Sequence, residues 1–265
     1  MRKLLASLLA GALLAAPAFA FEPEPGPDWV VSRAEQYCSL TRQSGPASFA
    51  LRTVPGSGVW EVRLASRNWS NVTLRDARRL AIRLQPEGGP LGGSQYARHT
   101  EAGRSLDVYQ IPRSDLGRFA AAQGITVARN RETILDIPLN GAAQAIAAVR
   151  QCEDETLREW GIDPVAFAAL RTPATGLPAA VVTDDDYPAA AMRAHQSGMV
   201  VVRLMIGANG RVSDCTPVVS SGHAILDTRT CQIFRERLRM TPAIGADGTP
   251  TAAPMVTPLG WRLPG

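Results

Sequence analysis

The sequence predicts an α+β protein: a strand-rich N-terminal domain that ends in a long helix, followed by a small α/β domain with a three-stranded antiparallel sheet. Three observations predict it. Short β-branched segments recur in which apolar and polar residues alternate, which is the period of a strand. One segment in each half has instead the apolar spacing of an amphipathic helix. With 45% hydrophobic and 20% charged residues, the 265-residue chain is long enough to bury two cores.

The first 20 residues have the pattern of an export signal. Met1-Arg2-Lys3 is basic, Leu4 to Ala15 is almost wholly apolar, and Ala18-Phe19-Ala20 is a small-residue cleavage site. The apolar run is short for a membrane span, which needs about 20 residues. We therefore expect cleavage after Ala20 and a soluble periplasmic protein. The alternative is an uncleaved segment that anchors the chain in the inner membrane.

Residues 21–161 are predicted to form the N-terminal domain. Its expected strands are the β-branched or alternating segments at residues 59–65, 80–84, 106–111, 125–127 and 133–139. A long helix is expected from Gly141 to Trp160, with Gly161 as its C-terminal stop. The early cysteine, the strands and the cysteine-bearing final helix resemble small periplasmic proteins of the invasion-associated locus B type, without a motif that assigns functional residues.

The four cysteines are Cys38, Cys152, Cys215 and Cys231. An even number in an exported protein favours disulfides, although the sequence does not fix the pairing. We expect Cys38–Cys152 and Cys215–Cys231, because each pair then lies within one domain. The alternative is four buried free thiols.

Residues 162–183 are predicted to be a linker, because the segment is rich in Pro, Ala and Thr. The second domain, residues 184–265, then opens with Asp184-Asp185-Asp186. A solvated linker end is the preferred interpretation of this acidic run, and calcium binding is the alternative. No ligand loop follows the run, and the sequence has no CxxC motif or Cys/His cluster, so we expect no metal site.

The C-terminal domain shows a regular succession of strand and helix signals. The expected elements are a strand at residues 199–206, a second strand at 211–219, a helix at 224–239 and a last strand at 255–263. Asn209-Gly210 is a strong hairpin signal between the first two strands, because both residues tolerate positive φ. Pro242 follows the helix and ends it.

This succession resembles the C-terminal domain of the TonB family, over residues about 182–264. The residues that carry the resemblance are Tyr187-Pro188, Gly198, Asn209-Gly210-Arg211-Val212, Ser220-Ser221-Gly222, Leu226-Asp227, the basic end of the long helix and Thr241-Pro242. One departure is Leu238-Arg239-Met240, where the family usually has Trp-Arg-Tyr/Phe. The core is therefore expected to use aliphatic and thioether groups instead.

The resemblance implies that this domain binds an extended peptide, which adds as a strand beside the last strand of the sheet. The expected partner is a protein or peptide of the cell envelope, such as the box segment of a TonB-dependent outer-membrane receptor, and the expected process is TonB-type transmembrane transport. The partner-binding edge strand would comprise Met255, Val256, Thr257, Leu259, Gly260 and Trp261. A conventional TonB transducer also keeps an N-terminal membrane helix and a long proline-rich spacer. Neither is expected here, so the resemblance implies the binding end without the motor end.

Two prolines restrict this edge. Alternate residues of a strand direct their backbone groups to the same side, so Pro254, Val256 and Pro258 share one edge. Because proline cannot donate a hydrogen bond, this must be the outer edge, and Val256 and Gly260 remain as its donors. The alternative interpretation is that the prolines protect an exposed edge against association.

The sequence gives little support for catalysis, cofactors or nucleic acid. The net charge of +4 loses two units with Arg2 and Lys3, so the mature protein is close to neutral. Lys3 is the only lysine, which excludes Schiff-base chemistry and lysine-containing phosphate loops from the mature chain. His99, His195 and His223 are isolated, and no Gly-x-Ser-x-Gly motif occurs. We expect no enzyme, no cofactor and no catalytic residue.

The leading hypothesis is a soluble periplasmic protein whose TonB-like domain engages an envelope partner. One alternative is a structural envelope protein without a transport role, in which this domain packs on the first domain or forms a homodimer. The second alternative is a membrane-anchored energy transducer, which applies if the signal segment is retained.

Overall fold

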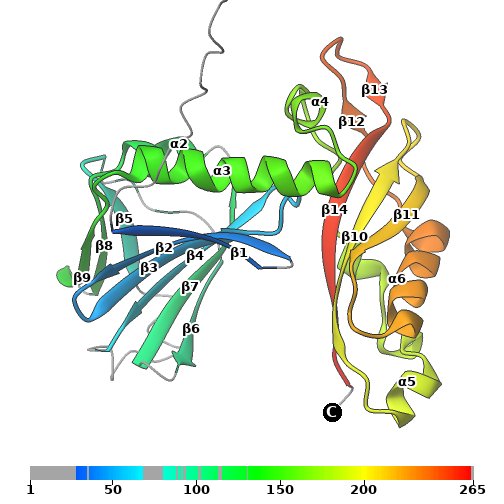
Figure 1. Cartoon of the computed structure of the whole chain (residues 1–265), viewed down its shortest axis with the longest axis horizontal. Helices are drawn as coiled ribbons and strands as arrows, with labels where there is room; N and C mark the ends of the chain where they lie inside the picture. The colour runs from blue at the N-terminus through cyan, green and yellow to red at the C-terminus, as the bar shows by residue number, and fades with distance from the viewer. Residues whose placement is uncertain are drawn as a thin grey trace, which may run out of the picture.

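The computed structural model describes residues 28–263, apart from residues 35, 68–79, 88, 90, 92–93, 101–102, 113–114 and 130. The expected export signal and its cleavage site lie outside the described residues. In the part of the chain that is described, no helix is long and apolar enough to cross a membrane. The architecture is α+β, as expected, with a strand-rich N-terminal part, several helices and a small C-terminal sheet (Figure 1).

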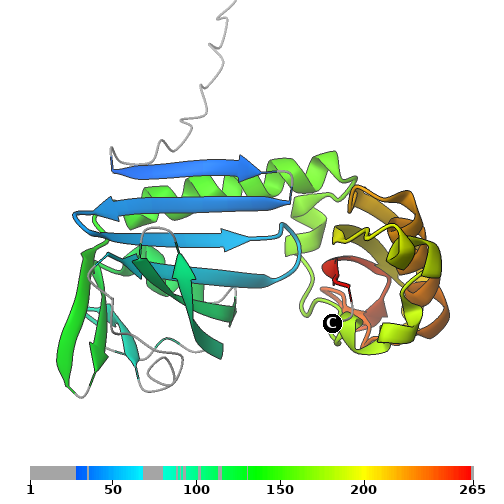
Figure 2. The same ribbon diagram turned by 90° about the horizontal axis from the view of Figure 1, so that it is seen from below.

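The N-terminal domain contains two antiparallel sheets. The larger has the strand order β1-β2-β3-β4-β7-β6, and the smaller has the order β5-β8-β9. Figure 2 shows β1 to β4 side by side, with β1 at the outer edge. The strands are β1 (Trp29–Ala34), β2 (Tyr37–Ser44), β3 (Ala47–Thr53), β4 (Val59–Ser66), β5 (Ala81–Gln85), β6 (Ser94–Thr100), β7 (Gly103–Pro112), β8 (Gly124–Arg129) and β9 (Glu132–Pro138).

The five strands expected in this domain are present as β4, β5, β7, β8 and β9, whereas β1, β2, β3 and β6 were not anticipated. The sequences of β2 and β3 explain why these two strands were not anticipated. In β2 and β3 the residues that alternate with the buried positions are Ser, Thr, Ala, Gln or Arg, apart from Tyr37, so the β-branched signal is weak.

The long helix α3 (Ala142–Glu159) packs over β1 and β2, with α2 (Leu116–Ala121) beside it (Figure 1). Its buried face includes Ala145, Val149 and Cys152. These residues join one core that unites both sheets with the two helices. The expected Cys38–Cys152 disulfide is present and ties β2 to α3.

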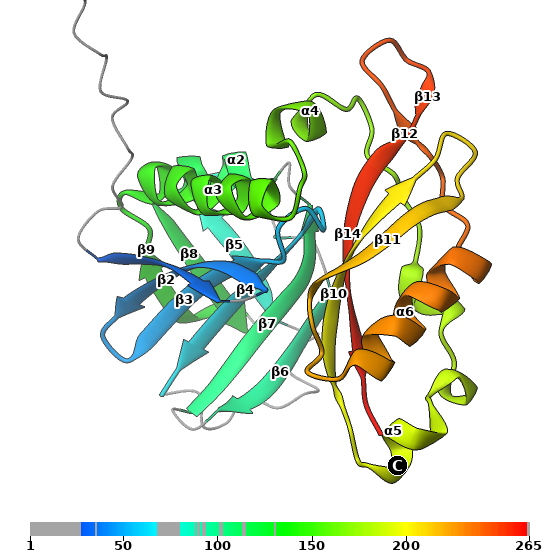
Figure 3. The same cartoon turned by 45° about the vertical axis from the view of Figure 1, so that its right-hand side comes forward.

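The C-terminal domain has a three-stranded antiparallel sheet in the order β11-β10-β14. Helix α6 lies against one face of this sheet (Figure 3). The elements are α5 (Ala189–Arg193), β10 (Gly198–Ile206), β11 (Val212–Val219), α6 (Ala224–Arg237), β12 (Ala243–Ile244), β13 (Pro250–Thr251) and β14 (Ala253–Trp261). The expected Cys215–Cys231 disulfide is present and ties β11 to α6. The β12–β13 hairpin was not anticipated, since two-residue strands carry no periodic signal.

The face of the sheet that meets α6 holds the core of this domain. The buried residues contributed by β10 and α6 are Val200, Val202, Leu204, Ile206, Leu226, Ile233 and Phe234. Leu238 and Met240 are also buried, which confirms the expected aliphatic and thioether packing. The indole Nε1 of Trp261 donates to Thr230 Oγ1 at 2.9 Å, and its ring meets Tyr187 edge-to-face at 5.3 Å.

Two glycines of the predicted family motif are required by close backbone contacts. A Cβ atom on Gly210, which has φ +73°, would lie 2.1 Å from the carbonyl oxygen of Met240. A Cβ atom on Gly198 would lie 2.2 Å from the carbonyl oxygen of Ser221. Both distances are far inside contact range, so a side chain at either position would displace the backbone.

Residues 162–183, predicted as a linker, pack along the C-terminal domain. The segment begins with the short helix α4 (Pro164–Ala168) and ends with the 3-10 helix η2 (Pro178–Val181), which contacts α6. Between them, Thr175 and Thr241 exchange two backbone hydrogen bonds, of 3.1 and 2.9 Å, and Ala174 is buried.

The acidic run at the end of this segment forms the 3-10 helix η3 (Asp184–Asp186). Asp186 is buried, and its carboxylate accepts from Arg229 Nη2 at 2.6 Å and from Arg237 Nη1 at 2.7 Å. The prediction of a solvated linker end is therefore wrong for Asp186, because its buried carboxylate forms ion pairs with two arginines of α6. Asp184 and Asp185 are exposed.

The other face of the C-terminal sheet is covered by the N-terminal domain (Figure 1). The residues that meet there, which we call the interdomain cluster, are Val54, Leu157, Trp160, Ile162, Val201 and Val256. Arg203 of β10 adds a polar contact, because its Nη1 donates to the carbonyl oxygen of Trp160 at 3.0 Å. The N-terminal domain thus packs against the middle of this face, whereas α6 lies against the opposite face.

Candidate functional site

Strand β14 lies at an edge of its sheet and pairs only with β10 among the described strands. The antiparallel register places Thr257 opposite Val202 and Met255 opposite Leu204. Pro254 and Pro258 cannot donate to this ladder, so their backbone faces must point away from β10. Val256 lies between them and directs its backbone groups to the same outer edge.

The side chains of the six predicted edge residues do not share one surface. Leu259 and Trp261 are buried in the core beneath α6, and Met255 packs against that core. Val256 points the other way, into the interdomain cluster, and is 1% exposed. Gly260 is exposed, and a Cβ atom there would meet nothing within 4 Å. Of the six, only Val256 and Gly260 direct their backbone groups to the outer edge, and the role of all six in binding a partner stays a prediction.

The turn between β3 and β4 stands against one side of this edge. It brings Gly56, which has φ +76°, directly against the strand. A Cβ atom on Gly56 would lie 2.9 Å from both Val256 Cγ2 and Leu157 Cδ2. The N-terminal domain therefore approaches β14 as closely as a glycine allows.

The connecting segment after α4 stands on the other side, where Gly176 packs against Met240. Two cavities, of about 700 and 320 Å³, follow the edge between these two walls. Ser57, Gly176 and Met255 line both cavities, so the two cavities adjoin. The larger reaches Pro254, and the smaller extends to Pro258. These volumes are those of sites that hold small ligands or short peptide segments.

The two ends of the paired cavities differ in charge. At the smaller one, Arg52 donates from Nε and Nη2 to Glu61 Oε2 at 2.9 and 2.7 Å, and its guanidinium lies over the Tyr37 ring at 4.8 Å. At the larger one, Arg171 is the only charged residue among the described residues of the lining, and it is exposed. Within the described ranges, no carboxylate forms an ion pair with Arg171.

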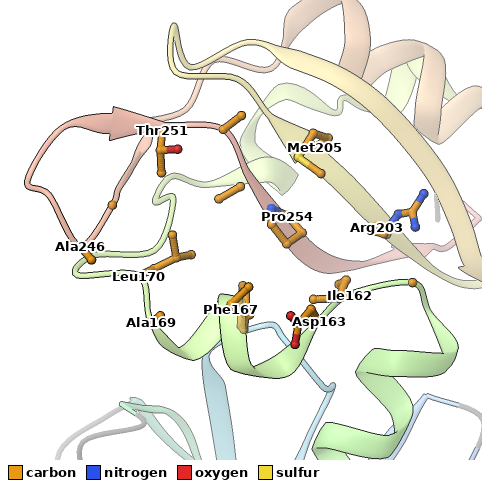
Figure 4. A pocket seen from close by; sticks show the side chains of 15 residues that line it. Ile162, Asp163, Phe167, Ala169, Leu170, Arg203, Met205, Ala246, Thr251 and Pro254 are labelled. Carbon is orange, nitrogen blue, oxygen red and sulfur yellow. The ribbon is translucent and has the colours of Figure 1, made fainter.

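A third cavity, of about 500 Å³, separates α4 from the upper part of the sheet (Figure 4). Phe167 and Leu170 lie on the α4 side, opposite Met205 and Pro254. Its lining is mostly apolar, and Arg203 at its border is already bound to backbone and side-chain oxygens. This cavity has no arrangement of groups for catalysis.

Two buried carboxylates of the C-terminal domain, Asp186 and Asp227, have structural partners. Burial alone would raise the pKa of Asp186, but hydrogen bonds from Arg237, Thr183 and Arg229 outweigh it and lower the pKa to about 2. Asp227 accepts from Ser221 N at 2.9 Å and from Ser220 Oγ at 2.6 Å, which fixes the turn before α6.

The histidines do not assemble into a site where they are described. His223 is the N-cap residue of α6, and His195 follows α5. The side chain of His99 lies outside the described residues. In the described part of the chain, no group of three or more His, Cys, Asp or Glu residues has metal-binding geometry.

The edge position of β14, the motif glycines and the succession of elements together point to one family. Residues 184–263 match the family of Gram-negative bacterial TonB protein C-terminal domains. Curated proteins gave no match to the chain, and solved structures gave none either. A TonB C-terminal domain is a non-enzymatic module for protein interaction, so the match indicates a TonB-like envelope protein associated with transport. The resemblance of the first domain to invasion-associated locus B proteins stays a prediction.

The sequence predicts contact between the two domains only as an alternative, whereas in the structure Val201 and Val256 pack against residues of the N-terminal domain. A signal for it was present. Met199 to Val202 is a continuous apolar run rather than an alternating one, which is typical of a strand buried on both faces. Val201 and Val256 are the residues on the second face.

Proposed function

We propose that this chain is an exported periplasmic protein that binds envelope partners by strand addition to β14, in connection with TonB-type transport. The single observation that carries the proposal is the outer edge of β14, which no other described strand pairs and which borders two adjoining cavities. The match of residues 184–263 to TonB C-terminal domains supports the same edge. No catalytic or cofactor role is proposed.

The direct test uses biotinylated peptides with the box sequence of TonB-dependent receptors, in a pull-down with the purified full-length mature protein. The matched control is a set of the same peptides with proline at alternate positions, which removes the donors that strand addition needs. We expect recovery by the box peptides and not by the proline peptides. Recovery by neither set would count against the proposal.

Two substitutions at Gly260 test the same strand addition by changing the protein instead of the peptide. Both Gly260→Ala and Gly260→Pro add a Cβ atom in open space, but only proline removes the outward N–H. We expect Gly260→Pro to weaken box-peptide binding by roughly 1 kcal/mol, the value of one hydrogen bond, and Gly260→Ala to leave it unchanged. Equal affinities for the two variants would show that the peptide does not use this edge.

Export is the second part of the proposal, and intact mass tests it. A periplasmic extract should contain a protein that begins at Phe21 and carries two disulfides. A mass that retains Met1 to Ala20 would favour a membrane-anchored transducer instead.

One observation favours a structural, dimerising role as a second candidate. Strand β1 is also an edge strand, and Val30 on it is 59% exposed. An exposed edge of this kind can pair with a second copy of the chain. Sedimentation that gives a monomer at every concentration would remove this candidate.

A further inference from the structure

The outer edge of β14 lies at the base of a slot that two other parts of the chain build. One wall is the β3–β4 turn, Gly56 to Gly58, and the other is the connecting segment, Pro173 to Gly176. The base is β14 from Pro254 to Pro258. We call this arrangement the edge slot. It matters because a peptide added to β14 would contact all three parts at once.

The backbone of the slot constrains what can bind. From 254 to 258 the outer edge offers one donor, the N–H of Val256, and three acceptors, the carbonyl oxygens of Pro254, Val256 and Pro258. A strand seated there must therefore donate more hydrogen bonds than it accepts. Its facing positions cannot be proline. The five residues of β14 from 254 to 258 span about 17 Å, which is the part of the paired segment that lies within the slot.

The charges of the slot differ between its ends. At the Pro258 end, Arg52 is already bound to Glu61 through two hydrogen bonds. At the Pro254 end, Arg171 is exposed and has no ion-pair partner among the described residues. Its Nη1 lies beside the β12–β13 turn, 3.5 Å from where a Cβ atom on Gly248 would stand, and a carboxylate that reaches this end of the slot would gain charge-assisted hydrogen bonds from the guanidinium there. None of the other described residues that line the larger cavity is charged.

We propose that the N-terminal domain and the connecting segment make β14 selective, so that the edge slot takes an extended, proline-free peptide with a carboxylate at the Arg171 end. The inference rests on the proposed function and adds two things to it: the chemical class of the peptide and a selecting residue outside the TonB C-terminal match. The carboxylate can be an Asp or Glu side chain or the free end of a chain.

The test measures fluorescence anisotropy of labelled ten-residue peptides of alternating Val and Thr with the full-length mature protein. One set is amidated at the C-terminus and carries Glu, Gln or Lys near either end. A second set carries Gln with a free C-terminal carboxylate. We expect the best carboxylate peptide to bind about tenfold more tightly than its Gln counterpart, and Lys to bind most weakly. The set to which this tightest-binding peptide belongs shows whether the slot recognises a carboxylate side chain or the free C-terminus of a chain.

Two variants, each with a matched control, assign the effect to the slot. Arg171→Glu should reverse the preference, so that the Lys peptide binds more tightly than the Glu peptide. Its control is Arg193→Glu, at an exposed position of α5, which should leave the preference unchanged. Ser57→Trp should obstruct the slot and weaken all peptides at least tenfold, whereas Ser213→Trp on exposed β11 should not. Thermal melting of all four variants establishes that each is folded.

The outcomes separate this inference from the proposed function. If peptides bind regardless of charge, and Ser57→Trp binds as well as the unmodified protein, the edge slot does not select and the inference is wrong, while strand addition stands. The same holds if Arg193→Glu reverses the preference as Arg171→Glu does. If no peptide binds and box peptides also fail, both proposals are wrong.

Discussion

The two faces of the C-terminal sheet are covered in different ways. On one face, α6 buries a cluster that includes Phe234 and is joined to β11 by the Cys215–Cys231 disulfide. On the other face, the N-terminal domain contributes the small interdomain cluster, the close contact of Gly56 with Val256 and few hydrogen bonds. The difference suggests a division of roles. Packing on the α6 face stabilises the fold, and the contacts on the second face limit which ligands can reach the edge of β14.

The largest expected effect is the loss of a core aromatic ring on the α6 face. Phe234→Ala should lower the free energy of unfolding by about 4 kcal/mol, because it removes a fully buried ring and leaves a cavity. Val256→Ala on the other face should cost about 2 kcal/mol, since it removes fewer apolar atoms. Urea unfolding measures both. Equal losses would mean that the two faces contribute alike to stability.

Burial of Asp186 beneath α6 gives a pH-dependent contribution on the same side. Its pKa is lowered from 3.8 to about 2 in the folded protein. A lowered carboxylate pKa stabilises the folded state above the unfolded value, and this stabilisation disappears as the pH falls from about 4 to about 2. Asp186→Asn should therefore cost about 2 kcal/mol at pH 7 and much less at pH 2.5. A cost that is the same at both pH values would contradict the ion-pair account.

On the second face, Gly56 allows a contact-specific test. Gly56→Ala and Gly58→Ala both place a Cβ atom at positive φ, but only the first Cβ would collide with Val256 and Leu157. We expect Gly56→Ala to be about 1–2 kcal/mol less stable than Gly58→Ala, the cost of overpacking. If the two variants melt at the same temperature, the turn does not press on β14.

The smallest effect should come from the polar contact between Tyr37 and Met199. The Tyr37 hydroxyl lies 3.7 Å from Met199 Sδ, and a thioether is a weak acceptor. Tyr37→Phe should therefore change the free energy of unfolding by less than about 0.5 kcal/mol. A larger loss would show that polar contacts between the domains contribute more than their number indicates.

Much of the C-terminal domain could be predicted from sequence because its signals are local. Asn209-Gly210 predicts the hairpin, and Pro254 and Pro258 predict which edge of the last strand faces outward. The cysteine pairs followed from domain membership and are present. These inferences need only neighbouring residues or chain order.

The features that escaped prediction depend on residues far apart in the chain. Gly56 carries no sign of its contact with Val256, which lies 200 positions later. Asp186 looked solvated within an acidic run, because Arg229 and Arg237 become its neighbours only through folding. The continuous apolar run from Met199 to Val202 was the one local indication that the second face is covered.

The nine-residue register between β10 and β14 also determines how the sheet responds to pulling. Hydrogen bonds of an antiparallel pair lie perpendicular to the strands. A force along β14 therefore loads all of them together, in shear, whereas a force across the strand opens them one after another from an end. A ligand strand paired with β14 would transmit tension best when drawn lengthwise. The sheet would then resist extraction strongly in that direction and release readily when peeled sideways.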